Sequence, residues 1–261
     1  MAVTEYITKS IGFSISEIGA VFILLVAAAK RIPQAARQKH LALEQMQKIG
    51  IGSLPLVLVT SVFTGGVAAV QAAYQFQNYV PMRYLGTVIG KSVVIELGPV
   101  LTALVVGGRV GASIAAELGT MKVTEQIDAL ETLAIDPIRY LVSPRLLAGI
   151  IMLPVITIFA DFIAIIGGYV VAVIGLDVSS HVYWTGFKLF LHVSDVTSGL
   201  IKALFFGVII AMMGCYHGLR TRGGAEGVGI ATTKAVVSSC LLILITDYIL
   251  ASLLFSGVFS G

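Results

Sequence analysis

Ionisable side chains lie inside apolar stretches of this sequence, where a charge is expensive and usually marks a function. Among them are Glu96, Arg109, Asp161 and Asp247. Carboxylates at such depth can form a pathway for ions or protons, and they can equally be buried partners of a cation. Glu96 and Arg109 would be about 20 Å apart along a helix, so they do not pair directly. Each is expected to find another partner, in this chain or in a second subunit.

A mostly acidic segment follows the apolar stretch 93–117 and predicts a helix over 121–134. Its apolar face would be formed by Val123, Ile127, Leu130 and Ala134, and its acidic face by Glu125, Asp128 and Glu131. Thr124 is expected to act as the N-cap. A surface helix on lipid head groups is the simple alternative, but anionic leaflets attract basic helices. The segment is therefore predicted to dock into a groove of another protein.

Small residues recur at every fourth position just before this segment. They are Ala103, Gly107, Gly111, Ala115 and Gly119. Such a stripe lets a second helix approach closely, so it predicts helix packing, either within the subunit or across a homodimer.

Aromatic and amide side chains alternate where the apolar stretch 54–75 ends, around Val70, Tyr74 and Tyr79. An aromatic belt at the membrane surface is the common meaning of this pattern. The alternative is a mouth for an amphiphile, in which the rings receive acyl chains and the amides receive a head group.

No residue set indicates catalysis, a cofactor, a metal or nucleic acid. The stretch 86–92 reads Gly-Thr-Val-Ile-Gly-Lys-Ser, but a phosphate-binding loop needs four residues between its glycines and this stretch has three. The histidines are scattered without metal-ligand spacing, and no nucleophile has a base beside it. Any nucleotide chemistry is therefore expected in a separate chain.

The composition places all these residues in a membrane. The chain is 57% hydrophobic and 12% charged, with a mean hydropathy of +0.97. Its apolar stretches are 11–29, 54–75, 93–117, 146–175, 199–218 and 230–258. Several are long enough to cross a bilayer, and the alternating strands of a barrel are absent from the pattern. We predict an all-α integral membrane protein with a single membrane domain over residues 1–261.

Basic residues between the apolar stretches predict the orientation. The segments after the first and third stretches and before the last contain ten lysines and arginines, against three in the alternating segments. The ten-residue set is expected on the cytoplasmic side. Stretch 11–29 contains Glu17 and is compatible with two arrangements: a span, giving six, or an interfacial helix, giving five. Ser143-Pro144 is expected to open the helix of stretch 146–175, with Ser143 as its N-cap.

Several ordered motifs resemble the MlaE permease family over essentially the whole chain. They are Glu96-Leu-Gly-Pro99, Gly108-Arg109-Val-Gly111, Ala116-Glu117-Leu-Gly119, Thr124-Glu125-Gln126, Asp136-Pro137, Ser143-Pro144-Arg145, and Gly-Ile-Ala-Thr-Thr-Lys-Ala-Val-Val at 229–237. The resemblance implies an N-terminal interfacial helix and basic cytoplasmic segment over 1–52, followed by a transmembrane bundle over 53–261. It also implies five transmembrane helices, with a cytoplasmic coupling helix between the second and third spans.

The resemblance further implies the permease subunit of an ABC transporter that moves phospholipids or related lipids between membranes. ATP and Mg would bind to partner ATPase subunits, and this chain would hold no cofactor and perform no catalysis. The coupling helix would be 120–133, with Thr124, Glu125, Gln126, Asp128 and Glu131 as its ATPase-coupling residues. Val70, Tyr74 and Tyr79 would belong to the lipid pathway.

The family also implies a homodimer and an outer-side partner, a lipid-binding protein with an MCE domain. No transit-peptide pattern precedes the first apolar stretch, so a bacterial inner membrane is expected in preference to a plastid envelope. The alternative is an ion-coupled secondary transporter or channel with Glu96, Asp161 and Asp247 as its ion pathway.

Overall fold

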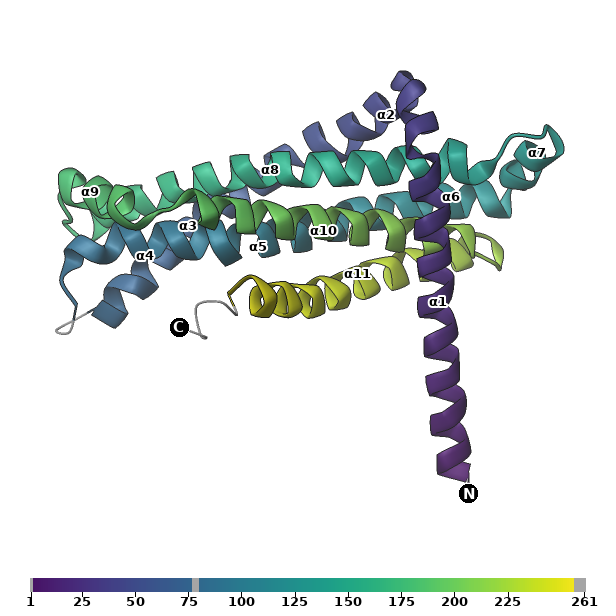
Figure 1. Cartoon of the computed structure of the whole chain (residues 1–261), viewed down its shortest axis with the longest axis horizontal. Coiled ribbons are helices and arrows are strands. Elements are labelled where there is room, and N and C mark those ends of the chain that lie inside the picture. The colour runs from purple at the N-terminus through teal and green to yellow at the C-terminus, as the bar shows by residue number, and fades with distance from the viewer. Residues whose placement is uncertain (1, 77–79, 256–261) are drawn as a thin grey trace.

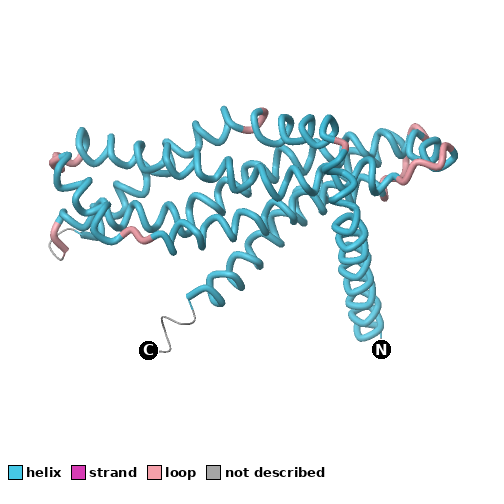
Figure 2. Tube along the Cα trace, turned by 45° about the horizontal axis from the view of Figure 1, so that its top comes forward, coloured by secondary structure: helices cyan, strands magenta, loops and turns pink. Residues whose placement is uncertain are grey.

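The chain folds almost entirely into helices. The computed structural model describes residues 2–76 and 80–255, and within them the side chains from Glu17 onward except at positions 190 and 255. Figure 2 shows the helices joined by short loops, and the described ranges contain no strand. Within these ranges, six helical segments are long and apolar enough to cross a bilayer: Glu17–Arg37, Lys39–Phe76, Met82–Val123, Ile138–Gly175, Val193–Leu219 and Gly224–Leu254. The protein is therefore an all-α, multi-pass membrane protein, as its composition predicts.

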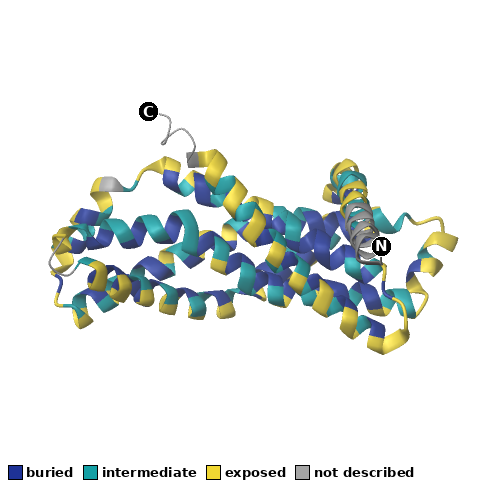
Figure 3. Cartoon of the chain, turned by 90° about the horizontal axis from the view of Figure 1, so that it is seen from below, coloured by how far each residue is buried: buried dark blue, intermediate teal, exposed yellow. Residues whose placement is uncertain are grey.

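The long helices lie side by side in one elongated bundle (Figure 1). α3 (Leu54–Phe76) packs on α8 (Ser143–Val170), α8 on α10 (Val193–Leu219), and α10 on α11 (Gly224–Phe255). Figure 3 shows buried residues gathered along the middle of the bundle. They form two apolar clusters, one along most of α8 and α10 and a smaller one near α9 (Ser180–Phe190).

One helical rod runs without interruption from Leu85 to Val123 beside this core. Its parts are α4 (Leu85–Ser92), η3 (Val93–Leu97), α5 (Gly98–Val106), η4 (Gly107–Gly111) and α6 (Ala112–Val123). At 1.5 Å per residue the rod is about 60 Å long, roughly twice the thickness of a hydrocarbon core. η3 and η4 are π-helical turns, and η3 directly precedes Pro99. The wider turn accommodates the proline, whose ring and missing N–H disturb a regular helix.

The helix predicted over 121–134 is wrong at its start. α6 continues through Val123, the backbone turns at Thr124 and Glu125, and α7 (Gln126–Thr132) is a separate, shorter helix. The Thr124 hydroxyl donates to the Thr120 carbonyl at 2.8 Å and so closes α6, instead of capping α7. Glu125 has φ 60° and Ala134 has φ 57°, a left-handed conformation that non-glycine residues seldom adopt. A sharp turn therefore flanks α7 on each side.

The predicted helix start at Ser143-Pro144 is confirmed for α8, which begins at Ser143 with Pro144 in its first turn, but the predicted N-cap role of Ser143 is wrong. η5 (Ile138–Val142) leads directly into α8, which continues through η6 (Val171–Gly175). The Ser143 hydroxyl lies 3.1 Å from the carbonyls of both Ile138 and Ala28. Ser143 is thus a buried contact between α8 and the N-terminal helix instead of a cap.

α1 (Ala2–Arg37) lies across the long axis of the bundle, near the end that carries α7 (Figure 1). It is held there by the Ser143–Ala28 hydrogen bond and by an ion pair in which Arg31 Nε lies 2.5 Å from Asp136 Oδ2. Its outer residues Ile18, Phe22 and Ile23 are exposed. If the bundle spans the bilayer, α1 lies in the membrane plane, so this orientation agrees with the interfacial alternative for 11–29.

The two ends of the bundle differ in charge. α2 (Lys39–Met46), α7 and the turn between α10 and α11 lie at one end, and α9 lies at the other with α4 (Figure 1). The first end contains the segments that are rich in lysine and arginine, so the charge rule predicts that it is the cytoplasmic end.

Candidate functional site

A buried lysine holds two carboxylates together in the membrane-spanning part of the bundle. Lys202 on α10 is 0% exposed, and its Nζ lies 2.6 Å from Glu96 Oε1 on η3 and 2.9 Å from Asp247 Oδ1 on α11. The Lys202–Glu96 contact is a hydrogen bond, and the Lys202–Asp247 contact is an ion pair at nearly the same distance. Three helices distant in sequence thus meet at one charged cluster.

Sequence analysis missed Lys202, although it placed Glu96 and Asp247 in apolar stretches. A signal for it was present, because Lys202 falls inside the apolar stretch 199–218 and a buried carboxylate needs a cation. The expectation that Glu96 and Arg109 do not pair is confirmed by these separate partners. Glu96 therefore pairs with a cation of the same subunit, Lys202.

Asp161 on α8 stands apart from this cluster. Its Oδ1 is buried, accepts no hydrogen bond from the described residues, and rests against the backbone at Gly98. A Cβ on Gly98 would overlap that oxygen. The glycine of the Glu96-Leu-Gly-Pro99 motif therefore provides the space that the Asp161 carboxylate fills.

Arg109 lies near the cytoplasmic end of the rod, at η4. Its Nη1 donates to Ser53 Oγ at 2.9 Å and to the Lys48 carbonyl at 3.3 Å. A Cβ on Gly52 would lie 2.7 Å from Arg109 Nη2, so the guanidinium packs directly on the turn before α3. In this position Arg109 joins the rod to the start of the first bundle helix.

The stripe of small residues faces α10 and α11 of the same subunit. All five members are buried: Ala103, Gly107, Gly111, Ala115 and Gly119. A Cβ on Gly107 would contact Ile210 at 3.5 Å, and one on Gly119 would lie 2.8 Å from Thr221 Oγ1. On α10, Gly214 and Gly218 in turn lie directly against the rod. The backbones of the rod and of α10 are therefore almost in contact.

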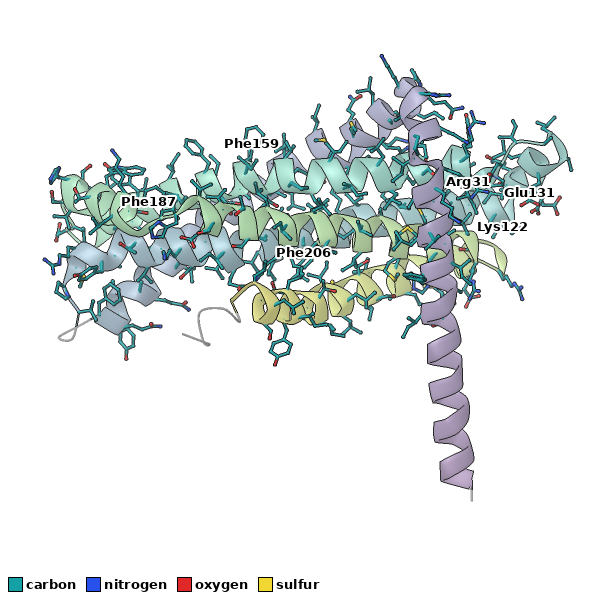
Figure 4. All side chains as sticks on the ribbon, viewed as in Figure 1. Arg31, Lys122, Glu131, Phe159, Phe187 and Phe206 are labelled. Atoms are coloured by element: carbon teal, nitrogen blue, oxygen red, sulfur yellow. The ribbon has the colours of Figure 1, made fainter. Side chains whose placement is uncertain are left out.

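α7 presents acidic and apolar residues at the cytoplasmic tip. Ile127 is buried against the bundle, whereas Leu133 is 70% exposed. The predicted coupling residues Thr124, Glu125, Gln126, Asp128 and Glu131 are all exposed. Asp128 pairs with Lys122 at 2.7 Å, and Gln126 Nε2 donates to Thr124 Oγ1 at 3.0 Å. Figure 4 shows Glu131 beyond Lys122 at the far end of the molecule.

A second charge network fixes the base of this tip. Glu117 on α6 bridges Arg145 of α8 at 2.9 Å and Lys48 of η1 (Gln47–Ile51) at 3.3 Å. Arg145 is buried, and its Nη1 also donates to the Leu141 carbonyl at 2.6 Å. The motifs contain Glu117 and Arg145, but their spacing of 28 positions gave no reason to pair them. The network ties the rod to two other helices where α7 begins.

An apolar groove of about 500 Å³ runs between α3 and the outer half of α8. Val62, Phe63, Val67, Val70, Ile163 and Ile166 are among the residues that line it. Val70 thus lies in the groove, and Tyr74, one turn further along α3, is 76% exposed. Tyr79 lies outside the described residues. The groove is open to whatever covers this face in the membrane.

The glycines of the rejected phosphate-loop pattern have a packing role. Gly86 lies against the backbone of Tyr183, and a Cβ on Gly90 would lie 2.7 Å from the Phe187 ring. Both aromatic residues belong to α9, where Phe187 is labelled in Figure 4. Small residues on α4 therefore let the aromatic outer helix rest closely on the bundle.

These features belong to residues that a known family model also matches. The model described as Permease MlaE matches residues 42–253, from α2 to the last turns of α11. The chain belongs to the MlaE permease family. All the charge clusters above lie inside the matched region except Arg31, and α1 lies outside it. As an MlaE permease, the chain is the membrane subunit of a transporter.

Curated relatives of this MlaE permease come from bacteria and from a plant. A probable ABC transporter permease protein of Rickettsia typhi is 49% identical over 82% of this chain and 83% of its own length. The intermembrane phospholipid transport system permease protein MlaE of Haemophilus influenzae is 36% identical over 86% and 87%. Protein TRIGALACTOSYLDIACYLGLYCEROL 1, chloroplastic, of Arabidopsis thaliana is 38% identical over 82% of this chain and 61% of its own length.

Proposed function

We propose that this MlaE permease is the membrane subunit of an ABC transporter that moves phospholipid between membranes, in a bacterial inner membrane. ATP and Mg bind to separate ATPase subunits in this proposal. The observation that carries it is the exposed acidic tip of α7, held by a rigid rod that continues through the membrane to the charged cluster at Lys202. The names of the Rickettsia and Haemophilus relatives support it.

The tip suits a protein partner better than a lipid surface. Its exposed acids would repel an anionic leaflet, whereas Leu133 supplies an apolar contact and the acids supply charge complementarity for a basic groove. We infer that an ATPase subunit binds α7. Movement of that subunit would then displace α7, whose two left-handed junctions at Glu125 and Ala134 separate it from the straight helices.

The rod would transmit this displacement upward. Its small-residue stripe packs at short range on α10 and α11, so a shift of the rod shifts those helices with it. The lipid would occupy the apolar groove that contains Val70 and that a second copy of the chain would close as a homodimer. An outer-side MCE-domain protein would then exchange lipid at the end that carries α9.

The charged cluster is the observation that favours the alternative, an ion-coupled transporter or channel. Glu96, Lys202 and Asp247 lie at membrane depth, where such groups often form ion pathways. Lys202 is fully buried and its charge is compensated by two carboxylates, an arrangement suited to joining helices. Lipid transfer that needs the ATPase and ignores an ion gradient would favour the ABC proposal, and the reverse result would favour the alternative.

The charge of the tip provides the first test. Glu131→Lys reverses an exposed charge that has no ion-pair partner among the described residues, so the fold is expected to persist. We expect weaker binding of the ATPase, by about tenfold, because a close favourable charge pair becomes a repulsive one. The measurement is the amount of ATPase that co-purifies with the full chain, together with ATP-dependent lipid transfer between vesicles.

Glu226→Lys is the matched control. Glu226 is an exposed acid at the same end, in the first turn of α11 and away from α7. It is expected to leave ATPase binding within about twofold of the unaltered chain, because reversing a distant exposed charge is largely screened. Equal losses in both variants, or normal binding by Glu131→Lys, would contradict the assignment of α7 as the docking element.

A further inference from the structure

A cavity of about 720 Å³ lies between α1, α10 and the start of α11. It is lined by Glu17 of α1, by the last turn of α10 and by one face of α11. It is distinct from the groove at Val70, which lies between α3 and α8. Neither α7 nor the cluster at Lys202 contributes to its walls.

The rim of this cavity is positively charged. Arg220, Arg222 and Lys234 line it, opposed by the single acid Glu17. Arg220 is engaged, because it stacks on the Tyr216 ring at 4.6 Å and donates to the Tyr216 hydroxyl at 2.5 Å. Arg222 and Lys234 are exposed, and neither forms an ion pair within the described part of the chain. Two cations are thus free to bind an anion.

Other polar groups that line the cavity are already paired. His217 Nε2 lies 2.8 Å from Ser238 Oγ, which joins α10 to α11 across the floor of the cavity. The Thr233 hydroxyl donates to the Gly229 carbonyl within its own helix at 3.1 Å. The free hydrogen-bonding capacity therefore belongs to the cationic rim.

The other wall is apolar and follows α11 away from that rim. Ile230, Val237 and Leu241 line the cavity at positions separated by seven and four residues, which places them on one face of the helix. All three are exposed. Arg222 lies just before α11 and Lys234 lies within it, between Ile230 and Val237, so cations and apolar residues line the same cavity and match the two chemical halves of a phospholipid.

The position of the cavity relative to the membrane selects the leaflet. Arg220 and Arg222 lie in the turn between α10 and α11, at the end where the basic segments gather. α1, which forms one wall, lies across the bundle at this same end. Lysine and arginine at the cytoplasmic surface attract anionic head groups. Arg220 and Arg222 therefore lie at the level of the cytoplasmic-leaflet phosphates, and the long side chain of Lys234 can extend toward them from within α11.

We propose that this cavity binds an anionic phospholipid of the cytoplasmic leaflet. The phosphate is held by Arg222 and Lys234, and the acyl chains lie along Ile230, Val237 and Leu241. The site gives the chain a lipid contact in the leaflet opposite to the Val70 groove. It stands independently of the transport proposal, because this binding needs neither ATP nor an ATPase.

The test uses the purified full chain in a non-ionic detergent, with dioleoyl phosphatidylglycerol as the probe and bound lipid counted by native mass spectrometry. Arg222→Gln/Lys234→Gln removes the two free cations without breaking a contact of the described residues. We expect its affinity for the probe to fall about thirtyfold, because two charge interactions with the anionic head group are lost near the membrane surface. Val237→Trp, which fills the apolar wall while keeping the cations, is expected to lower lipid affinity as well.

Lys30→Gln/Arg139→Gln is the matched control, since it removes the same charge from exposed positions at the same end, outside the cavity. Normal probe binding by this control, with loss in the cavity variants, supports the site. Equal loss in both double variants means general surface attraction and overturns it. Displacement of the probe by an equal concentration of inorganic phosphate also overturns it, because the site would then recognise free phosphate. Unchanged affinity in Arg222→Gln/Lys234→Gln overturns it too.

Discussion

At the scale of single residues, the ammonium group of Lys202 lowers the energetic cost of placing the carboxylates of Glu96 and Asp247 in the membrane. Glu96 and Asp247 come from different helices, and the same ammonium group compensates both. Removing one member of such a cluster leaves an uncompensated buried charge, whereas removing all members together can be nearly neutral. The cluster therefore determines which helices pack together more than it adds to the net stability of the fold.

Lys202→Met is expected to lower stability by about 3 to 5 kcal/mol, because Glu96 and Asp247 are then left facing each other. The triple variant Glu96→Gln/Lys202→Met/Asp247→Asn is expected to recover most of that loss. Thermal unfolding of the chain in detergent measures both. A triple variant no more stable than Lys202→Met would show that the charges were not the cause.

Gly98 and Asp161 form a second residue pair. The Asp161 carboxylate fills the space that is left because Gly98 has no side chain. Gly98→Ala is expected to cost about 1 to 3 kcal/mol, because its Cβ displaces the Asp161 carboxylate from a packed site. Gly108→Ala is the matched control, since a Cβ on Gly108 meets no atom within 4 Å. The melting temperatures of the two variants compare them directly.

Gly98→Ala/Asp161→Ala completes this comparison. The smaller side chain at 161 leaves room for the new methyl group, so the double variant is expected to melt above Gly98→Ala. If the double variant melts lower than Gly98→Ala, the overlap between the new methyl group and Asp161 is not the cause of the lost stability. The result would also separate packing of Asp161 from an ion-carrying role, because lipid transfer can be measured in the same variant.

At the scale of elements, α1 packs on α8 and η5, and its ion pair with the bundle joins Arg31 to Asp136. Burial alone would raise the pKa of Asp136, but the hydrogen bond from Arg31 and the backbone N–H groups of Arg139 and Ile138 outweigh it and hold that pKa below its ordinary value. A lowered carboxyl pKa stabilises the folded state above the unfolded value, near 4, and this contribution is lost as pH falls through the lowered value. The pair is partly exposed, so it contributes about 0.2 to 1 kcal/mol.

The α1 attachment is therefore expected to loosen below about pH 4. Hydrogen exchange of the amides in α1 and η5, measured between pH 3 and pH 6 with correction for intrinsic exchange rates, would report it. Asp136→Asn is expected to show the loosened behaviour already at pH 6 and to lose the pH dependence. If Asp136→Asn keeps the steep pH dependence of hydrogen exchange, that dependence belongs to another titrating group.

The elements also show what sequence patterns could and could not predict. Apolar stretches located the six long apolar helices of the described residues, because burial in lipid depends on composition and length. The acidic segment predicted a helix at α7 but not the break before it, since the left-handed turn at Glu125 leaves no mark in the spacing of apolar residues. The role of Ser143 was predicted wrongly because its hydroxyl bonds to α1, a contact between residues 115 positions apart.

At the scale of the whole molecule, the fold class was predictable and the charge partners were not. The orientation of the bundle in the membrane is predicted from loop charges, and the structure gathers those loops at one end. Pairings such as Lys202 with Asp247 depend on which helices become neighbours, which a single sequence does not encode locally. The predicted roles of α7, of Val70 and Tyr74, and of the single domain over 1–261 remain predictions for the experiments above.

The cluster at Lys202 also constrains how the chain is made. Glu96 is synthesised first, Lys202 roughly a hundred residues later, and Asp247 near the end, so the first carboxylate enters the bilayer before its cation exists. Helices can be inserted one by one, but Glu96 gains its cation only when the helix that carries Lys202 arrives, and Asp247 joins the pair with the last helix. A nascent chain stalled between the second and fourth spans thus holds Glu96 in the membrane without its partner, where an unpaired charge is costly.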